Sequence, residues 1–350
     1  MSLLIYGAYG YTGRLVARRA AEKDLAPTLA GRNAEKLRAV AREVDLPHRA
    51  FALGDTTALR EAVSEADAVL HCAGPFARTA RPMVEACLHE GAHYLDITGE
   101  IEVFEYVASQ EARAVEAGVM LMPGVGFDVV PTDCLAAYLA QQQPGAQYLE
   151  LAILATGGGV SGGTAATAAM NAGRGGAIRK DGRITRTPAA WRTRCADFGR
   201  GPTDVTSIPW GDVVTAWHTT GIPNIITYAK LPDAAVRLLK ASNYAGPLLR
   251  ARPVQSFLEA FAKERASGPD ASTRRTAQSF VWGQARTGSG RAVTARLSAP
   301  ETYTLTARTA LESAERVRDG HADPGFQTPA GHFGTDYILD FEGTRREDLP

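Results

Sequence analysis

The stretch LLIYGAYGYTG, residues 3–13, decides the fold of this 350-residue chain. It opens with a short apolar run, Leu3–Tyr6, that predicts a β-strand, and it leads into an amphipathic helical pattern over residues 13–23. Glycine between a strand and a helix permits a tight turn and close approach of the backbone to a pyrophosphate, while the helix start offers free N–H groups. The sequence therefore predicts a dinucleotide site, with GxxGxxG spacing as a variant of GxGxxG, that is formed by Gly7, Ala8, Tyr9, Gly10, Tyr11, Thr12 and Gly13.

Short apolar runs and helical patterns continue to alternate through the first 130 residues. Strands separated by helices are typical of βαβ units, and short apolar strands fit a parallel sheet that is covered on both faces. We expect residues 1–130 to form a Rossmann domain, an α/β fold with a doubly wound parallel sheet. Five further strands are predicted at Thr28–Ala30, Arg49–Ala52, Ala68–His71, Tyr94–Ile97 and Val119–Met122.

The pattern changes after Pro131. A second α+β domain with a largely antiparallel sheet is expected over residues 131–325, where it would bind substrate or form a dimer interface. A C-terminal segment, residues 326–350, is expected to return to the Rossmann domain. The elements predicted in the second domain include strands at Tyr148–Ala155, Asp204–Ile208, Val213–His218, Ile225–Tyr228 and Arg291–Leu297 and helices at Asp133–Gln142 and Tyr303–Arg318.

The composition excludes several classes of protein. Thirty-eight basic residues against thirty-eight acidic ones give no net charge, which argues against a nucleic acid or an anionic membrane as the main partner. The four cysteines form no CxxC pair, so we expect free thiols in a reducing compartment. The N-terminus does not resemble a signal peptide and no apolar run reaches 18 residues, so a cytoplasmic location is expected. Cys87, His89 and His93 lack the spacing of a metal site, and none is predicted.

Cofactor choice is decided after the second strand, in the segment Ala30-Gly31-Arg32-Asn33. Arg32 stands nineteen residues after Gly13 (from 13 to 32), where an NAD-binding protein would have an acidic residue for the ribose 2′-OH. A 2′-phosphate could instead be held by the Arg32 guanidinium and by the helix that begins near Asn33. This pattern favours NADP(H), although a solvated arginine in a turn is the alternative interpretation.

Two later loops are also expected to contact the cofactor, because ligands lie at the carboxyl ends of strands in such sheets. Asp55 follows the third strand and could meet the adenine, cap a helix, or do both. The small residues Ala73, Gly74 and Pro75 follow the fourth strand and suit close passage of the nicotinamide half.

Several motifs together carry a resemblance to a known family. They are the glycine-rich start, AGRN at residues 30–33, HCAGPF at 71–76, YLDITGE at 94–100 and PGVGFDVVPTD at 123–133. With further matches as far as Gly334, the chain resembles the saccharopine dehydrogenase-like oxidoreductases, in particular the branch that includes mycobacterial trans-acting enoyl reductases. The resemblance implies a Rossmann domain, NADP(H)-linked redox chemistry, and cofactor contacts from Gly7, Gly10, Gly13 and Arg32. It does not imply a substrate.

The proton donor that must accompany hydride transfer is not obvious from the sequence. No tyrosine is followed four residues later by lysine, so the YxxxK pair of short-chain dehydrogenases is absent. A carboxyl group buried near the cofactor could act as a general acid through a raised pKa. The candidates that we select are Glu100, after the fifth strand, and Asp128, after the sixth.

The expected reaction is reduction of a C=C, C=N or C=O bond in a small molecule or an acyl substrate, with enoyl reduction as the first hypothesis. The alternative is a non-catalytic NADP(H)-binding sensor or assembly partner, which the missing YxxxK pair would suit. A homodimer is compatible with the sequence.

A second glycine-rich segment, residues 156–163, precedes a helix of small residues. Ser161 and Thr164 there could bind a substrate carboxylate, or the segment could be a flexible loop with a helix cap. Residues 234–266 interleave apolar residues with Arg and Lys. Such a pattern could contact a membrane surface or an acyl chain, but we favour core packing, a lid or a dimer face.

Overall fold

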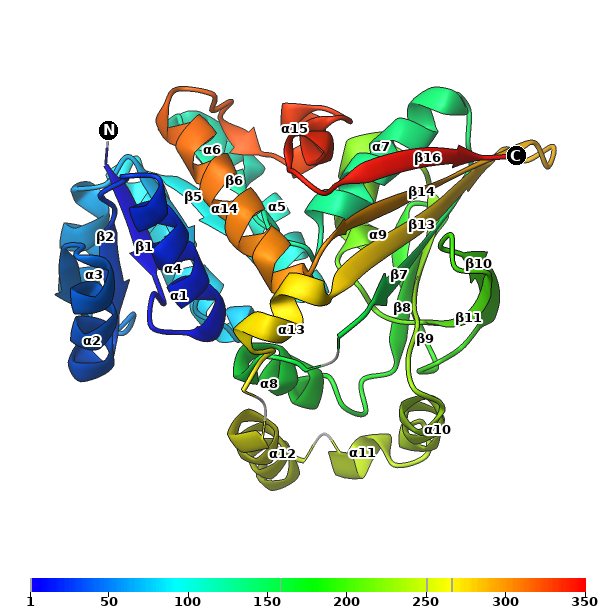
Figure 1. Cartoon of the computed structure of the whole chain (residues 1–350), viewed down its shortest axis with the longest axis horizontal. Helices are drawn as coiled ribbons and strands as arrows, with labels where there is room; N and C mark the ends of the chain where they lie inside the picture. The colour runs from blue at the N-terminus through cyan, green and yellow to red at the C-terminus, as the bar shows by residue number, and fades with distance from the viewer. Residues whose placement is uncertain (1, 158, 250, 266) are drawn as a thin grey trace. The chain divides into compact units, whose positions relative to one another are not determined.

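The computed structural model describes residues 2–157, 159–249, 251–265 and 267–350, which form two compact units (Figure 1). The first unit contains the residues up to Asp128 together with Tyr303–His332. The second contains Val129–Thr302 and Phe333–Pro350.

The first unit is built on a seven-stranded sheet in the order β15-β6-β5-β4-β1-β2-β3, in which all neighbouring strands are parallel. The strand order reverses between β1 and β4, which is the point where ligands bind in doubly wound sheets. The predicted fold class is confirmed. The strands are β1 (Leu3–Tyr6), β2 (Thr28–Gly31), β3 (His48–Ala50), β4 (Ala68–His71), β5 (His93–Asp96), β6 (Met120–Met122) and β15 (Gly325–Phe326).

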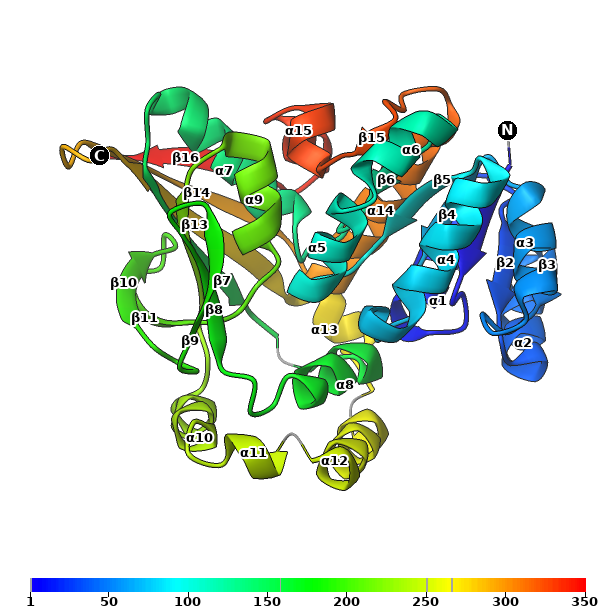
Figure 2. The ribbon, with the colours of Figure 1, turned by 180° about the vertical axis from the view of Figure 1, so that it is seen from behind.

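Helices cover both faces of this sheet. In Figure 1, α1 and α14 lie in front of it, and in Figure 2, from behind, α4, α5 and α6 lie in front. Helix α2 packs beside α1, and α3 packs beside α4. The helices are α1 (Tyr11–Glu22), α2 (Ala34–Val44), α3 (Thr56–Ser64), α4 (Phe76–Glu90), α5 (Ile101–Ala108), α6 (Glu111–Ala117) and α14 (Thr302–Arg318).

The division into units differs from the domain boundaries expected at residues 130 and 325. The expected boundaries place helix α14 in the second domain, but nearly all of it belongs to the first unit. The reason is that the chain returns there to add β15, whose Gly325 and Phe326 pair with β6. Conversely, residues 333–350 were expected in the Rossmann domain but lie in the second unit, where β16 (Arg345–Leu349) pairs with β14 (Ala292–Pro300).

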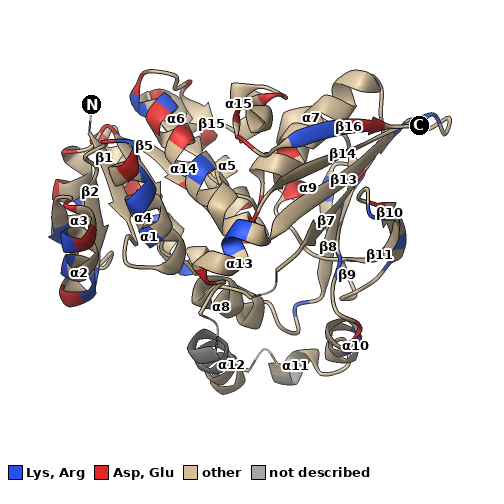
Figure 3. Ribbon diagram, in the orientation of Figure 1, with Lys and Arg blue, Asp and Glu red and all other residues tan. Residues whose placement is uncertain are grey.

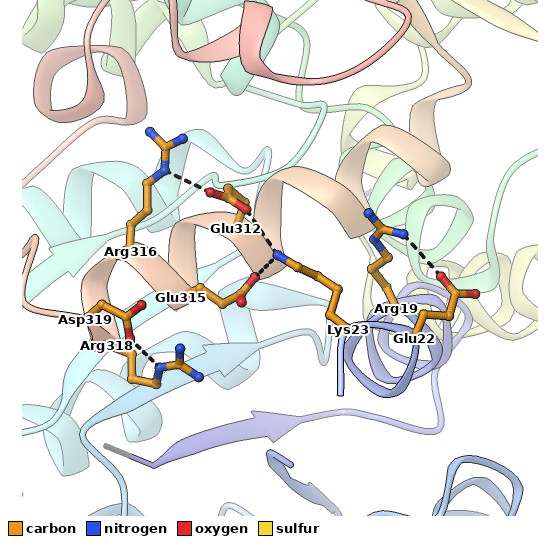
Figure 4. A network of polar contacts seen from close by, with 8 residues as sticks. All are labelled: Arg19, Glu22, Lys23, Glu312, Glu315, Arg316, Arg318 and Asp319. Carbon is orange, nitrogen blue, oxygen red and sulfur yellow. Dashed lines mark hydrogen bonds and ion pairs between the residues drawn. The ribbon is translucent and has the colours of Figure 1, made fainter. Parts of the chain in front are cut away.

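Ion pairs join α14 to α1 within the first unit (Figure 4). The Nζ atom of Lys23 at the end of α1 lies 3.3 Å from Glu312 and 2.5 Å from Glu315 on α14. Partial burial disfavours the ammonium form, but the two carboxylates outweigh it and raise the pKa of Lys23. Half-exposed pairs of this kind contribute little stability each, so the network orients α14 more than it stabilises the unit.

The second unit contains a mixed sheet in the order β10-β11-β12-β7-β13-β14-β16, with β8 pairing with β12 and β9. The β7–β12 pair is parallel, and the other pairs are antiparallel. The largely antiparallel sheet predicted here is therefore confirmed. Its remaining strands are β7 (Tyr148–Ala155), β8 (Gly176–Lys180), β9 (Arg183–Thr187), β10 (Thr193–Asp197), β11 (Pro202–Ser207), β12 (Asn224–Ala229) and β13 (Gln278–Arg286).

One element of the second unit was predicted wrongly. The apolar run Val213–His218 was expected to be a strand but lies in helix α9. Its β-branched residues favour a strand locally, but α9 buries Val213 and Val214 and packs against α7, which overrides that preference. The other helical segments are α7 (Val130–Gln142), α8 (Gly162–Met170), α9 (Asp212–Thr220), α10 (Asp233–Ser242), α11 (Gly246–Leu249), α12 (Arg252–Arg265), α13 (Ala271–Thr276), α15 (Pro329–Phe333) and the 3₁₀ helix η1 (Tyr337–Asp340).

Residues 234–266 form α10, α11 and α12, although residues 250 and 266 lie outside the described residues. Helix α12 packs on α8. Leu238, Tyr244 and Phe257 are 72%, 92% and 66% exposed, so these three side chains are not core residues. Basic and acidic residues are interspersed along α2, α3 and α14 (Figure 3). Within the described part of the chain, no helix has the length and apolar character needed to span a membrane.

The core of the first unit contains one polar side chain that lacks a partner. His71, the last residue of β4, is fully buried between the rings of Tyr6, Phe76 and Tyr94. Neither ring nitrogen has a hydrogen-bond partner among the described residues. Burial lowers the pKa of His71 to about 3, because the imidazolium form cannot be solvated there.

We therefore expect His71→Phe to stabilise the protein in acid. The unfolded chain binds a proton at His71 below about pH 6.5, whereas the folded protein does not until about pH 3. As the pH is lowered through that window, this group should therefore reduce the free energy of unfolding of the wild type by up to about 1.4 kcal/mol per pH unit. Urea unfolding followed by circular dichroism from pH 7 to 4 would measure both proteins. Parallel pH profiles for the two would contradict the expectation.

Candidate functional site

The glycine loop between β1 and α1 depends on close backbone contacts. The N–H of Gly7 donates to the carbonyl of Ala30 (2.8 Å), and the N–H of Gly10 donates to the carbonyl of Gly7 (2.9 Å). Gly7 has φ +89°, and a Cβ there would lie 2.8 Å from the Cβ of Ala73. A Cβ on Gly13 would lie 2.3 Å from the oxygen of Gly7. Larger side chains at positions 7 and 13 would therefore force the loop apart.

This loop leaves the start of α1 open for an anion. Gly10 is the N-cap residue, so no side chain satisfies the first N–H groups, and the first turn contains no acidic residue. Both features suit a pyrophosphate. The ring of Tyr11 packs edge-on against Tyr303 at 4.9 Å, which directs that side chain towards α14.

The segment after β2 presents the arginine on which the choice of cofactor depends. Arg32 is exposed, and its guanidinium makes no ion pair or hydrogen bond within the described ranges of the chain. Asn33 caps α2, because its Oδ1 accepts the N–H of Lys36 (2.9 Å). The Asn33 side chain is thus already engaged, whereas Arg32 is available for an anionic group.

The two later loops are each held by local hydrogen bonds. Asp55 caps α3, since its Oδ1 accepts the N–H of Ala58 (3.1 Å); a contact with adenine stays a prediction. In the loop after β4, the hydroxyl of Thr79 donates to the carbonyl of Ala73 (2.6 Å). Ala73 also lies against Gly7, as described above. Ala73, Gly74 and Pro75 therefore form a loop of fixed conformation next to the glycine loop.

Glu100 binds the two residues that directly follow this loop. Its two carboxylate oxygens accept the N–H groups of Phe76 and Ala77, each at 2.8 Å, at the start of α4. A helix N-terminus stabilises an anion. This geometry favours Glu100 as a residue that positions α4 rather than as the proton donor that the sequence suggested.

Asp96, the last residue of β5, is a fully buried carboxylate that joins two loops. Its carboxylate accepts hydrogen bonds from the hydroxyl of Tyr94 (2.6 Å) and from the N–H groups of Thr98 and Gly124 (2.9 Å each). Burial raises the pKa of Asp96 to about 6, although these donors oppose the shift. The residue therefore ties the loop after β5 to the loop after β6.

Helix α14 holds the loop after β6 in place. The N–H of Phe127 donates to the hydroxyl of Thr306 (3.0 Å), and the hydroxyl of Thr309 donates to the carbonyl of Val125 (2.8 Å). A Cβ on Gly126 would lie 2.8 Å from a methyl carbon of Thr306, so the loop and helix are in direct contact. The next residue after this anchored stretch is Asp128.

Asp128 has the properties expected of a general acid. It is half-buried, and its Oδ2 lies 2.9 Å from the position that a Cβ of Gly99 would occupy. Burial and the nearby negative charge of Glu100 raise the pKa of Asp128 to about 7. A carboxyl group with such a pKa is partly protonated at neutral pH and can both donate and accept a proton.

Ser161 and Thr164 belong to the second unit. Ser161 is the N-cap of α8: its Oγ accepts the N–H of Thr164 (3.2 Å) and lies 3.0 Å from the Thr164 hydroxyl. The helix cap considered from the sequence is thus present, and a contact with substrate stays a prediction.

The cysteines are free, and three of them are buried. Burial raises the pKa of the Cys72 thiol to about 12, which makes it a poor nucleophile. Within the ranges that the structure describes, no group of three or more His, Cys, Asp or Glu residues could hold a metal ion.

A family model described as the saccharopine dehydrogenase NADP binding domain matches residues 3–122, which supply all but one strand of the parallel sheet. Residues 3–122 are thus similar to the NADP-binding domain of this family. The resemblance drawn from the sequence motifs is therefore confirmed, and the match supports NADP(H) as the cofactor.

Curated relatives extend the match slightly beyond this domain. A saccharopine dehydrogenase-like oxidoreductase of Mus musculus is 31% identical over 163 residues, covering 41% of this chain and 38% of the relative. A trans-acting enoyl reductase of Mycobacterium ulcerans is 30% identical over 139 residues, covering 37% and 33%. The matches thus span less than half the length of these relatives. A probable mitochondrial relative of Arabidopsis thaliana is 33% identical over 157 residues, covering 40% and 35%, and the cytoplasmic location stays a prediction.

The fold of the whole chain has a counterpart among solved structures. Apo saccharopine dehydrogenase (L-Glu forming) from Saccharomyces cerevisiae aligns over 100% of both chains with a TM-score of 0.67. The sequence identity is 11%, so this likeness shows a shared fold and no more.

The role of Asp96 as an anchor leads to a stability prediction. Asp96→Ala would leave three buried donors without an acceptor, so we expect a loss on the order of 3 kcal/mol in the free energy of unfolding. Asp96→Asn keeps one oxygen for Thr98 and Gly124 and should lose much less. Urea unfolding at pH 7 would test both variants. Equal losses would mean that the charge of Asp96, rather than its accepting oxygens, holds the two loops.

Proposed function

We propose that the protein is an NADP(H)-dependent oxidoreductase that reduces a polarised double bond, with an enoyl group of an acyl substrate as the first choice. The observation that carries the proposal is the position of Asp128, a half-buried acid in the loop after β6 whose Oδ2 lies against Gly99 in the loop after β5. Burial and the charge of Glu100 raise the pKa of this carboxyl group to about 7. The glycine loop, Arg32 and Asp128 all follow carboxyl ends of strands in one parallel sheet. Such ends meet at a single edge, where ligands bind.

Each part of the site has a separate task in this proposal. The open N-terminus of α1 binds the pyrophosphate, Arg32 binds the 2′-phosphate, and Ala73, Gly74 and Pro75 line the path of the nicotinamide half. Bound NADPH supplies a hydride to the substrate. Protonated Asp128 donates a proton to the anion left on the substrate, and Glu100 keeps the pKa of Asp128 high through its negative charge.

The acyl class of the substrate is part of the proposal. Its support is that one group of relatives carries the name trans-acting enoyl reductase. Substrate contacts by Ser161 and Thr164 and a homodimeric assembly belong to the same proposal, together with hydride transfer to C=N or C=O bonds as the next reactions to test.

Asp128→Asn should lower kcat for NADPH-dependent reduction by about 10²- to 10⁴-fold. In the wild type, the rate should fall as pH rises through about 7, because only the protonated acid donates. The variant should lose this dependence. Stopped-flow measurement of NADPH oxidation from pH 5.5 to 9 would record both effects on a panel of enoyl, imine and keto substrates.

Glu105→Gln removes an exposed carboxylate from α5 and serves as the control, since it should keep the wild-type profile. An unchanged pH profile in Asp128→Asn would show that another group donates the proton. NADPH binding without turnover on the whole panel would favour the non-catalytic sensor or assembly partner instead.

Arg32→Ala should weaken NADPH binding by about 10- to 100-fold, since charged hydrogen bonds contribute roughly 1.5–3 kcal/mol. NADH binding should change little, because NADH has no 2′-phosphate. Titration of tryptophan fluorescence with each nucleotide would give both dissociation constants. Arg38→Ala, an exposed arginine on α2, is the matched control. Equal losses for the two nucleotides would remove the argument for NADP(H) specificity.

A further inference from the structure

The side chain of Tyr9 leaves the glycine loop and lies across the end of β2. A Cβ on Gly31 would lie 2.6 Å from Cε1 and 3.0 Å from Cδ1 of the Tyr9 ring. The ring is therefore packed on the backbone of Gly31, and a larger residue at position 31 would displace it. Tyr9 is half-buried in this position, although its neighbours in the loop are glycine and alanine.

Two hydrogen-bond donors belong to this end of β2. Arg32 follows Gly31 directly, and in the part of the chain that the structure describes neither its guanidinium nor the Tyr9 hydroxyl has a protein partner. The other polar side chains nearby are engaged: Asn33 caps α2 and Asp55 caps α3. The end of β2 thus presents one cation and one phenol without acceptors.

A third residue, Tyr6, lies beside the end of β2, because it pairs in register with Ala30. The hydroxyl of Tyr6 donates to the carbonyl of Phe51 (3.3 Å), at the end of β3. Burial raises the pKa of Tyr6 to about 12, Tyr9 adds to this increase, and Arg32 opposes it. Both Tyr9 and Arg32 thus interact electrostatically with Tyr6.

We propose that the Tyr9 hydroxyl and the Arg32 guanidinium together bind the 2′-phosphate of NADP(H). Gly31 is required because a side chain at that position would occupy the space of the Tyr9 ring. This inference rests on the proposed cofactor and adds a specificity-determining residue to it. A phosphate monoester offers three strong acceptor oxygens, so guanidinium and phenol can bind different oxygens at once. A ribose 2′-OH has no such charge and would gain little from either group.

Tyr9→Phe tests the hydroxyl alone, because phenylalanine keeps the ring on Gly31. We expect Kd for 2′,5′-ADP and for NADPH to rise about tenfold. Kd for 5′-ADP and NADH should stay within about twofold, since neither carries the 2′-phosphate. Isothermal titration calorimetry with the four nucleotides measures binding without any turnover. Tyr244→Phe, which removes a hydroxyl from a side chain that is 92% exposed, is the matched control.

The double variant Tyr9→Phe, Arg32→Ala tests whether the two groups bind one phosphate. Its loss of 2′,5′-ADP affinity should be smaller than the product of the two single losses, because without Arg32 the phosphate is no longer held against the phenol. Gly31→Ala should reproduce the Tyr9→Phe loss by displacing the ring, with circular dichroism as the check on folding.

Two results would overturn the proposal. Equal weakening of NADPH and NADH by Tyr9→Phe would mean that the phenol contacts the shared part of the nucleotide. No change for either nucleotide would mean that the hydroxyl does not reach the phosphate. In both cases the NADP(H) assignment would stand if Arg32→Ala still abolished the preference for NADPH over NADH. A wild-type protein that binds 5′-ADP as tightly as 2′,5′-ADP would instead contradict the NADP(H) assignment itself.

Discussion

The candidate site depends on one buried carboxylate, that of Asp96. It accepts hydrogen bonds from Tyr94, Thr98 and Gly124, and in doing so it fixes the loops after two neighbouring strands. Burial of a carboxylate is costly unless its oxygens are satisfied, and three donors satisfy this one. Glu100 lies on one of the two loops and Asp128 on the other. Their relative positions therefore follow from the Asp96 contacts.

Much of the first unit could be predicted because its signals are local. The strands of a parallel sheet are short apolar runs, and glycine spacing marks the loop between β1 and α1. Strand β15 could not be found in this way, because two residues, Gly325 and Phe326, have no periodicity. It is a strand only because β6 provides a partner. Helix α14 leads to this strand, and for that reason it belongs to the first unit rather than to its expected domain.

The sequence indicated which types of residue form the site better than it indicated what each residue does. In the sequence, Asp128 and Glu100 look alike, since both are acids that follow strands, and only the fold shows that their roles differ. Glu100 meets two N–H groups of α4, a helix that begins 24 residues earlier in the chain. Asp128 meets the backbone of Gly99. Likewise, no spacing rule shows that the Tyr9 ring turns away from its own loop to Gly31. Contacts between loops that follow different strands cannot be read from the spacing of residues within one short segment.

The three carboxylates of this site are also coupled through charge. Glu100 contributes to the raised pKa of both Asp96 and Asp128, and its own charge is held by the start of α4. A change that moved the start of α4 would therefore also move the charge that keeps Asp128 partly protonated at pH 7. The loop Ala73–Pro75, which leads into α4, is the segment proposed to contact the nicotinamide half of the cofactor. Cofactor binding and the proton affinity of the proposed acid are thus linked through one helix N-terminus.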